Sequence, residues 1–175
     1  PLDALGYADT DGNLNAGDYD IEGQERVDVF GASLTASVNF AGITLTSISA
    51  YRGYGFGAVN DSEQTRFDIA TTGTLVDHKQ YSQELQLLSP EGSAISWIAG
   101  AFYLHDKSGF LPLSARSPLL VPGAAGFDFY SPIETTSYAV FAQATFPLTQ
   151  QLGLTVGGRY TWDKKEKGDG RREIV

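Results

Sequence analysis

The densest group of possible metal ligands lies near the N-terminus, in the stretch Asp9-Thr-Asp11-Gly-Asn13-Leu-Asn15-Ala-Gly-Asp18-Tyr-Asp20. Counted from Asp9, oxygen-bearing side chains stand at positions 1, 3, 5 and 12, as in a calcium-binding loop. The match fails at position 6, where Leu14 replaces the turn glycine, and at position 12, where Asp20 replaces a bidentate glutamate. Calcium binding over residues 9–20 stays open, with a solvated acidic loop as the simpler alternative.

Acid–base and nucleophilic chemistry has little support in the sequence. There are two histidines, His78 and His105, and no local motif such as G-x-S-x-G places a nucleophile beside either. The lack of cysteine excludes disulfides and thiolate metal sites. Glycines alternate at 53, 55 and 57 with no following helix or lysine, which favours sheet curvature over a phosphate-binding loop. We therefore predict that the protein is not an enzyme, and assign no catalytic residue, cofactor or metal site.

Composition narrows the class further. Twelve Lys and Arg against 21 Asp and Glu give a net charge of −9, which argues against nucleic acid as a partner. No apolar run reaches the roughly 18–20 residues of a membrane-spanning helix. A chain that opens at Pro1 and holds no methionine is expected to be part of something longer, either a natural truncation or a cut segment.

Alternation with a period of two is the main structural signal. Between Phe30 and Phe40 the even positions are apolar and the odd positions are small or polar. These aromatics are ten residues apart, and a tilted membrane strand needs roughly 9–11. Two later segments repeat the design and three are less regular, giving predicted strands at 27–40, 43–56, 79–89, 95–105, 135–147 and 152–165. The orientation of 95–105 stays open, because both of its faces carry apolar residues.

The pattern predicts an all-β fold of antiparallel up-and-down strands, about six strands of a larger transmembrane β-barrel. Tight turns alternate with long predicted loops at 57–78 and 106–134, the layout of outer-membrane barrels. We expect a partial barrel over 27–167, an acidic loop or disordered segment over 1–26, and the start of an outer loop at 168–175. A soluble β-sandwich is the alternative, because its strands also alternate.

The alternation also suggests which side chains face lipid and which face the lumen. Six aromatics flank the apolar stripes and are predicted at the membrane–water interface: Phe30, Phe40, Tyr138, Phe146, Tyr160 and Trp162. A lipid-facing arginine near the midplane would cost roughly 2–4 kcal/mol, so polar residues on the opposite faces are predicted to face the lumen. These are Arg52, Glu84, Gln86 and Arg159. Pairing within the wall is as good an explanation for them as contact with a plug or solute.

Four segments carry a family pattern: ITLTSISAYR at 43–52, YSQELQLLSP at 81–90, SWIAGAFYLHD at 96–106, and the stretch 135–167. Their order and spacing resemble the barrel of TonB-dependent outer-membrane receptors. The resemblance implies a barrel of about 22 strands around a plug domain, with a segment that binds the energy-coupling protein. Nothing in this sequence resembles the plug or that segment, so we expect a partial receptor that is not functional alone.

The resemblance implies energy-coupled uptake of a siderophore or another scarce solute across the outer membrane of a Gram-negative bacterium. The expected partners are membrane lipid, an unknown small solute and, in the full-length protein, its own plug and a TonB-type coupling protein; nucleic acid is not expected. The alternative is a soluble or surface-attached β-sandwich for binding or adhesion. An outward apolar band would support the receptor, and a dry core between two sheets would support the sandwich.

Overall fold

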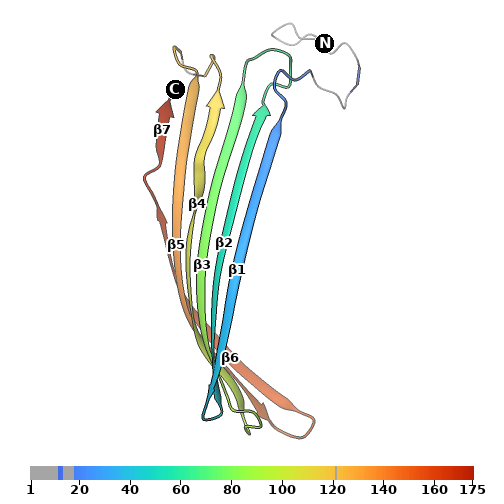
Figure 1. The fold of residues 1–175 in the computed structure, drawn as a ribbon, viewed down its shortest axis with the longest axis vertical. Helices are drawn as coiled ribbons and strands as arrows, with labels where there is room; N and C mark the ends of the chain where they lie inside the picture. The colour runs from blue at the N-terminus through green and yellow to red at the C-terminus, as the bar shows by residue number, and fades with distance from the viewer. Residues whose placement is uncertain (1–11, 14–17, 121) are drawn as a thin grey trace.

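The structure is a computed structural model that describes residues 12–13, 18–120 and 122–175. Its strands are β1 (Gln24–Phe40), β2 (Ile43–Asp61), β3 (Thr71–Leu88), β4 (Ser96–Arg116), β5 (Gly126–Pro147), β6 (Gly153–Lys167) and β7 (Arg171–Ile174). The first six are neighbours in chain order, every pair is antiparallel, and short β7 pairs with β5. The result is one long, twisted and curved sheet (Figure 1). The predicted all-β, up-and-down fold is confirmed.

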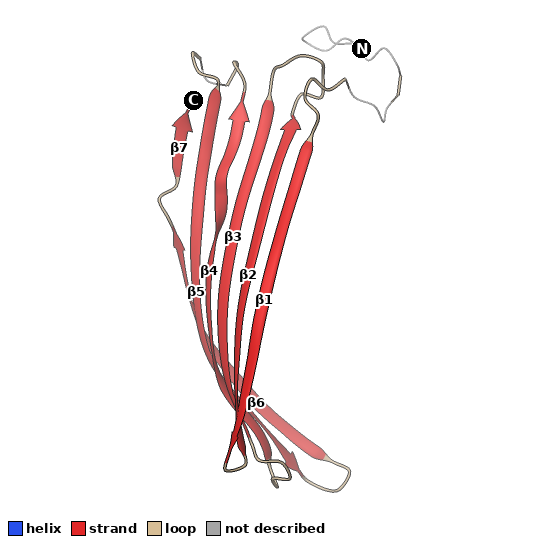
Figure 2. Ribbon diagram, in the orientation of Figure 1, coloured by secondary structure: helices blue, strands red, loops and turns tan. Residues whose placement is uncertain are grey.

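Helices have no part in the described residues, which form only strands, turns and loops (Figure 2). In that part of the chain no helix has the length and hydropathy to cross a membrane.

The end of the sheet opposite the C-terminus carries the shorter connections, and we call it the turn end (Figure 1). Between β1 and β2 the turn is two residues, Ala41 and Gly42, with φ of 50° and 85°. Two positive φ values in a two-residue hairpin match the twist of the flanking strands. The Asn39 side chain closes the turn by accepting the Gly42 N–H at 3.1 Å. The remaining connections there are 89–95 and 148–152.

At the opposite end, which we call the loop end, the strands run further than the sequence predicted. The long loops expected at 57–78 and 106–134 are wrong in extent, because strand pairing covers most of both segments and leaves loops of 62–70 and 117–125. The predicted strand ends marked where the apolar pattern stopped. Backbone pairing does not stop there, since the ladder needs N–H and C=O groups and not apolar side chains.

Proline and glycine made the second segment resemble a loop, and the structure accommodates them at irregular points in the sheet. Pro112 lies where the register of β4 shifts, between Phe110 and Leu113, and a bulge spares it a ladder hydrogen bond. Pro132 lies opposite Gly109, where any Cβ would meet the Pro132 Cα at 2.8 Å. These residues bend the strands without ending them.

The two ends of the chain differ from prediction in smaller ways. The segment 168–175 holds β7, which pairs with residues 127–130 of β5, and is therefore not only the start of a loop. Gly168 donates its N–H to the Pro132 carbonyl at 2.9 Å across the interruption between β6 and β7. The acidic segment predicted over 1–26 reaches into β1, which begins at Gln24, and residues 1–11 and 14–17 lie outside the described residues.

The described residues have almost no hydrophobic core. They form a single sheet, and the hydrophobic side chains buried within it are those of Ala58 and Ala139. A sandwich would bury large side chains between two sheets. The sandwich alternative is therefore wrong, and the apolar residues must be covered by something other than a second layer of this segment.

Candidate functional site: the two faces of the sheet

One face of the sheet is apolar in all six long strands. Side chains directly opposite each other on paired strands lie on the same face. One such row runs through Val38, Leu45, Leu87, Ala99, Ala142 and Gly158. The large side chains on this face are exposed, with Leu34 at 70% and Tyr160 at 60%. We call it the apolar face; the other is the polar face.

The orientation of β4, open from the sequence, follows from its pairing. Tyr103 lies opposite Tyr138 and Ala101 opposite Val140, so these β4 residues share the apolar face. Ile98 and Phe102 project from the polar face. Phe102 has a specific contact there, described below, which explains an apolar residue on that side.

Aromatic residues cross the apolar face in a continuous series that we call the aromatic ladder: Phe30, Tyr51, Tyr81, Tyr103, Tyr138, Tyr160 and Trp162. Ring centroids are 6.3 Å apart for Phe30 and Tyr51, 5.1 Å for Tyr103 and Tyr138, and 4.4 Å for Tyr160 and Trp162. Toward the turn end, Phe40 and Phe146 lie on the same face. Aromatic side chains thus bound the apolar residues on both sides.

Three polar side chains interrupt the apolar face between β2 and β3, and they satisfy one another. Ser49 donates to Gln83 Oε1 at 2.5 Å, while Gln83 Nε2 donates to the Ser47 hydroxyl at 2.9 Å. The Tyr81 hydroxyl of the ladder also donates to Gln83, at 3.3 Å. Polar groups cost least in an apolar setting when their hydrogen bonds are made, so this cluster is compatible with an apolar environment.

Beyond the ladder, toward the loop end, the same face becomes charged. Its acids and bases form ion pairs with nitrogen–oxygen distances of 2.7–2.9 Å: Arg26–Asp28, Lys79–Asp77, Lys107–Glu134, Arg116–Asp128, Lys164–Glu166 and Arg171–Glu173. We call this region the charged extension. Most of its side chains are well exposed, and pairs of that kind contribute about 0–1 kcal/mol each. The charged extension is suited to water.

Asp128 is the most enclosed acid in the charged extension. The Ser114 hydroxyl donates to its carboxylate at 2.7 Å, and Arg116 donates at the same distance. These hydrogen bonds favour the ionised form and hold the pKa of Asp128 below its usual value. The three residues join the tips of β4 and β5.

The polar face carries the four residues that the sequence singled out, Arg52, Glu84, Gln86 and Arg159. Pairing puts Arg52 opposite Gln80, Glu84 opposite Phe102, Gln86 opposite Gly100, and Arg159 opposite Phe141. All four lie on the side away from the aromatic ladder. Gln86 donates a hydrogen bond to Glu84 two residues earlier on β3, so these two form a local pair.

Arg159 is held by aromatic rings rather than by an acid. Its guanidinium lies 5.2 Å from the ring centre of Phe102 and 5.8 Å from that of Phe141, and its Nε donates to Thr161 at 3.2 Å. The Phe141 ring lies over Gly100, where a Cβ would come within 2.9 Å of the ring Cε1. A cation over aromatic faces keeps hydrogen-bond donors free for another group.

The histidines fall on opposite faces. His78 projects from the polar face and contacts the Asp106 carboxylate, with both side chains partly buried. His105 lies on the apolar face beside Tyr81, and its Nδ1 is hydrogen-bonded to the Thr136 hydroxyl at 3.2 Å. Because the two histidines project from opposite faces of the sheet, they do not form one site.

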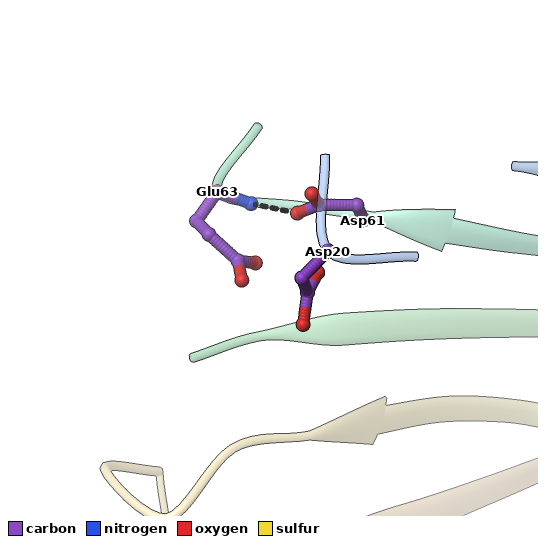
Figure 3. Close-up of side chains that lie close together, drawn as sticks. All are labelled: Asp20, Asp61 and Glu63. Carbon is purple, nitrogen blue, oxygen red and sulfur yellow. Dashed lines mark hydrogen bonds between the residues drawn. The ribbon is translucent and has the colours of Figure 1, made fainter. Parts of the chain in front are cut away.

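A cluster of three acids lies at the loop end. Asp61 ends β2, Glu63 follows it in the loop, and Asp20 comes from the segment before β1. Each offers one carboxylate oxygen, and these oxygens lie within 4.8 Å of one another (Figure 3). Among the described residues, this is the group with the composition of a metal site, and it includes Asp20, the last residue of the stretch 9–20 for which the sequence left calcium binding open.

The sequence anticipated some of these features and missed others. The ends of the ladder at Phe30, Tyr138, Tyr160 and Trp162 were predicted, but Tyr51, Tyr81 and Tyr103 were not. On the apolar face, Ser47 and Ser49 of β2 and Gln83 of β3 stand where the alternation calls for apolar residues. They make the apolar face of these two strands hard to recognise in the sequence. Tyrosines spaced like those of the regular strands were the available signal. The sequence gives no signal that Asp20 lies near Asp61, because 41 positions separate them.

Two comparisons bear on identity. The family model described as "TonB dependent receptor-like, beta-barrel" matches residues 2–173. Among curated proteins no sequence matches.

Proposed function

The chain belongs to the family of TonB-dependent receptor-like β-barrels, and on that premise we propose that its sheet is one part of the wall of an outer-membrane receptor. The receptor would take up a scarce solute, such as a siderophore, with energy supplied through a TonB-type protein. The family is one of receptors and transporters, and its β-barrels are outer-membrane proteins. The location of this chain, its solute and its energy coupling are proposals.

The apolar face carries the proposal. Phe30 and Phe40 are ten residues apart on β1, which is about 33 Å along a strand. A strand tilted by about 35–45° then spans about 23–27 Å, close to the roughly 25 Å apolar band of outer-membrane barrels. Exposed apolar side chains bounded by aromatics at both ends are what such a band requires.

The open edges of the sheet fit the same proposal. Strands β1 and β6 each pair on one side only along their lengths within the described residues. In lipid an unpaired strand edge is strongly unfavourable, and single-chain barrels start at about eight strands. We propose that further strands pair with β1 and β6 in the working receptor, and that the polar face then lines the lumen.

In that arrangement the lumen residues meet a plug domain or the passing solute. Arg159 is the strongest candidate, because its stacking on Phe102 and Phe141 fixes it while leaving guanidinium donors unused. Glu84 is coupled to Gln86 and is better explained as part of the wall. No group in this arrangement makes or breaks a covalent bond; the chemistry is recognition and passage.

Single-cysteine labelling in outer membranes tests the proposal, since the segment contributes no cysteine of its own. Residues 33–38 of β1 would be replaced one at a time and treated with a water-soluble maleimide. We expect labelling at Ser33, Thr35 and Ser37, and protection at Leu34, Ala36 and Val38. Equal labelling of both sets, or recovery of the protein in the soluble fraction, would contradict a lipid-facing band.

A further inference from the structure

The acid cluster at the loop end has a feature that ordinary surface acids lack. Asp61 is only 8% exposed, and its Oδ2 is buried with no hydrogen-bond partner among the described residues. Its other oxygen, Oδ1, accepts the N–H groups of Glu63 and Gln64 at 3.1 and 2.9 Å. Buried acceptors nearly always have a partner. The lone pairs of Asp61 Oδ2 are therefore available to a further ligand.

Backbone groups also fix the Glu63 side chain. Glu63 accepts the N–H of Ile69 and of Ala70, both at 3.0 Å, one on each carboxylate oxygen. The loop is therefore folded around this side chain, which cannot turn away without losing both hydrogen bonds. Figure 3 shows the Asp61 carboxylate directed at the backbone N–H of Glu63, with the Glu63 and Asp20 side chains beside it and Asp20 coming from a separate segment.

No base offsets the charge. Within the described ranges, none of the three acids takes part in an ion pair with lysine or arginine at 4.0 Å or less. The cluster thus holds carboxylates that repel one another.

We propose that Asp20, Asp61 and Glu63 bind a calcium ion that ties the segment before β1 to the loop between β2 and β3. Calcium is bound by oxygen ligands at about 2.3–2.6 Å, so two ligands on one ion can lie up to about 5 Å apart. The observed limit of 4.8 Å fits that geometry. Asp61 Oδ2 would gain its missing partner, and water and backbone oxygens would complete the coordination.

The choice of calcium follows from the ligand set. The cluster has carboxylates and no histidine or cysteine, which disfavours zinc and copper. Magnesium demands a nearly ideal octahedron and keeps much of its water, whereas calcium accepts irregular sets of oxygens from separate loops. The inference does not depend on the transport function, because it rests on these side chains alone.

Trypsin cleavage at Arg66, inside the 62–70 loop, gives a direct readout. Purified protein in detergent would be digested with calcium chloride from 0.01 to 10 mM, with magnesium chloride in parallel. We expect calcium to slow cleavage at Arg66 at least fivefold, with a midpoint of about 0.1–1 mM, the range of extracellular calcium modules. Magnesium at equal concentration should protect much less. Calcium binding would be measured on the same samples by titration calorimetry.

Two variants and one control decide the outcome. Asp61→Asn keeps an acceptor for the Glu63 and Gln64 N–H groups but weakens the site, and should lose protection. Asp20→Asn lies outside every strand and cannot disturb the sheet, so it should lose protection even if Asp61→Asn fails to fold. Glu22→Gln is the control: it removes one negative charge two residues from Asp20 and should keep the protection by calcium. Undiminished protection in Asp20→Asn, equal protection by magnesium, or none at 10 mM calcium would each overturn the proposal.

Discussion

The apolar face below the aromatic ladder and the charged extension above it lie on the same strands, yet they differ in almost every side chain. Below, Leu34 and Val38 are exposed with no protein to cover them. Above, acids and bases pair across the surface. The backbone pairing continues unbroken through the boundary in β1 and β2. Backbone hydrogen bonds thus hold the sheet together along its whole length, whereas the type of side chain at each level corresponds to the surrounding medium.

The largest effect on stability should come from placing a charge on the apolar face between the aromatic ladder and the turn end. Leu34→Arg puts a guanidinium near the middle of the stretch from Phe30 to Phe40, and should reduce the free energy of unfolding in lipid vesicles by about 2–4 kcal/mol. Thr35→Arg, its neighbour on the polar face, is the matched control and should cost much less. Urea titration in vesicles measures both. Equal costs would mean that the two faces meet the same medium.

The next largest loss of stability should come from a substitution on the polar face that does not change the charge. At Gly100 a Cβ would lie 2.6 Å from the Leu85 carbonyl oxygen and press on the Phe141 ring. Gly100→Ala should therefore cost about 1–3 kcal/mol, as overpacking does, and should displace Arg159 from its aromatic contacts. Gly158→Ala on the apolar face has nothing within 4 Å and should be nearly neutral. A nearly neutral Gly100→Ala would show that Phe141 and the neighbouring backbone yield to the added Cβ.

A smaller, pH-dependent effect is expected in the charged extension. The folded-state pKa of Asp128 is lowered, so its contribution to stability is present above the unfolded value of 3.8 and is lost as the pH falls below it. Removing the Ser114 and Arg116 contacts should cost about 1 kcal/mol or less, because Arg116 is partly exposed. Thermal unfolding of native protein and Asp128→Asn should differ at pH 6, and the difference should shrink as the pH falls progressively below 3.8. A difference that does not shrink in acid would locate the effect elsewhere.

The smallest effect belongs to the exposed pairs. Lys164 and Glu166 are 70% and 62% exposed at their side chains, and such a pair contributes about 0–1 kcal/mol. Lys164→Ala should leave the unfolding midpoint nearly unchanged, and salt should alter it little. A large loss would show that the charged extension is less hydrated than its composition indicates.

This comparison also explains what could be predicted from the sequence. The part of each strand between the aromatic ladder and the turn end has a period-two pattern that only one strand orientation satisfies, so β1, β5 and β6 were located and the residues that share their apolar face were identified. The charged extension has no such pattern: Asp77 and the prolines resemble a loop. Its strands exist because their neighbours extend and pair with them, which is a non-local cause that no local pattern contains.

The acid cluster shows the same limit. The stretch 9–20 attracted attention through its acids, but the ligands that complete Asp20 come from the end of β2. Asp61 and Glu63 are unremarkable in sequence, one after a glycine-rich strand and one in a polar loop. Only the antiparallel return of β1 beside β2 brings them to Asp20, through the pairing of Gln24 with Val59.

The aromatic ladder has a geometric consequence for the whole barrel. The level of each ring can be read on β1 by following the strand pairing back to it. Relative to Phe30, Tyr51 lies two residues nearer the turn end, Tyr103 and Trp162 lie four residues nearer, and Tyr160 lies six residues nearer. That is a stagger of about one residue per strand. If the ladder follows a level in the membrane, the shear number about equals the number of strands. With about 3.3 Å per residue and 4.8 Å between strands, the strands then lean about 35° from the barrel axis, whatever their total number.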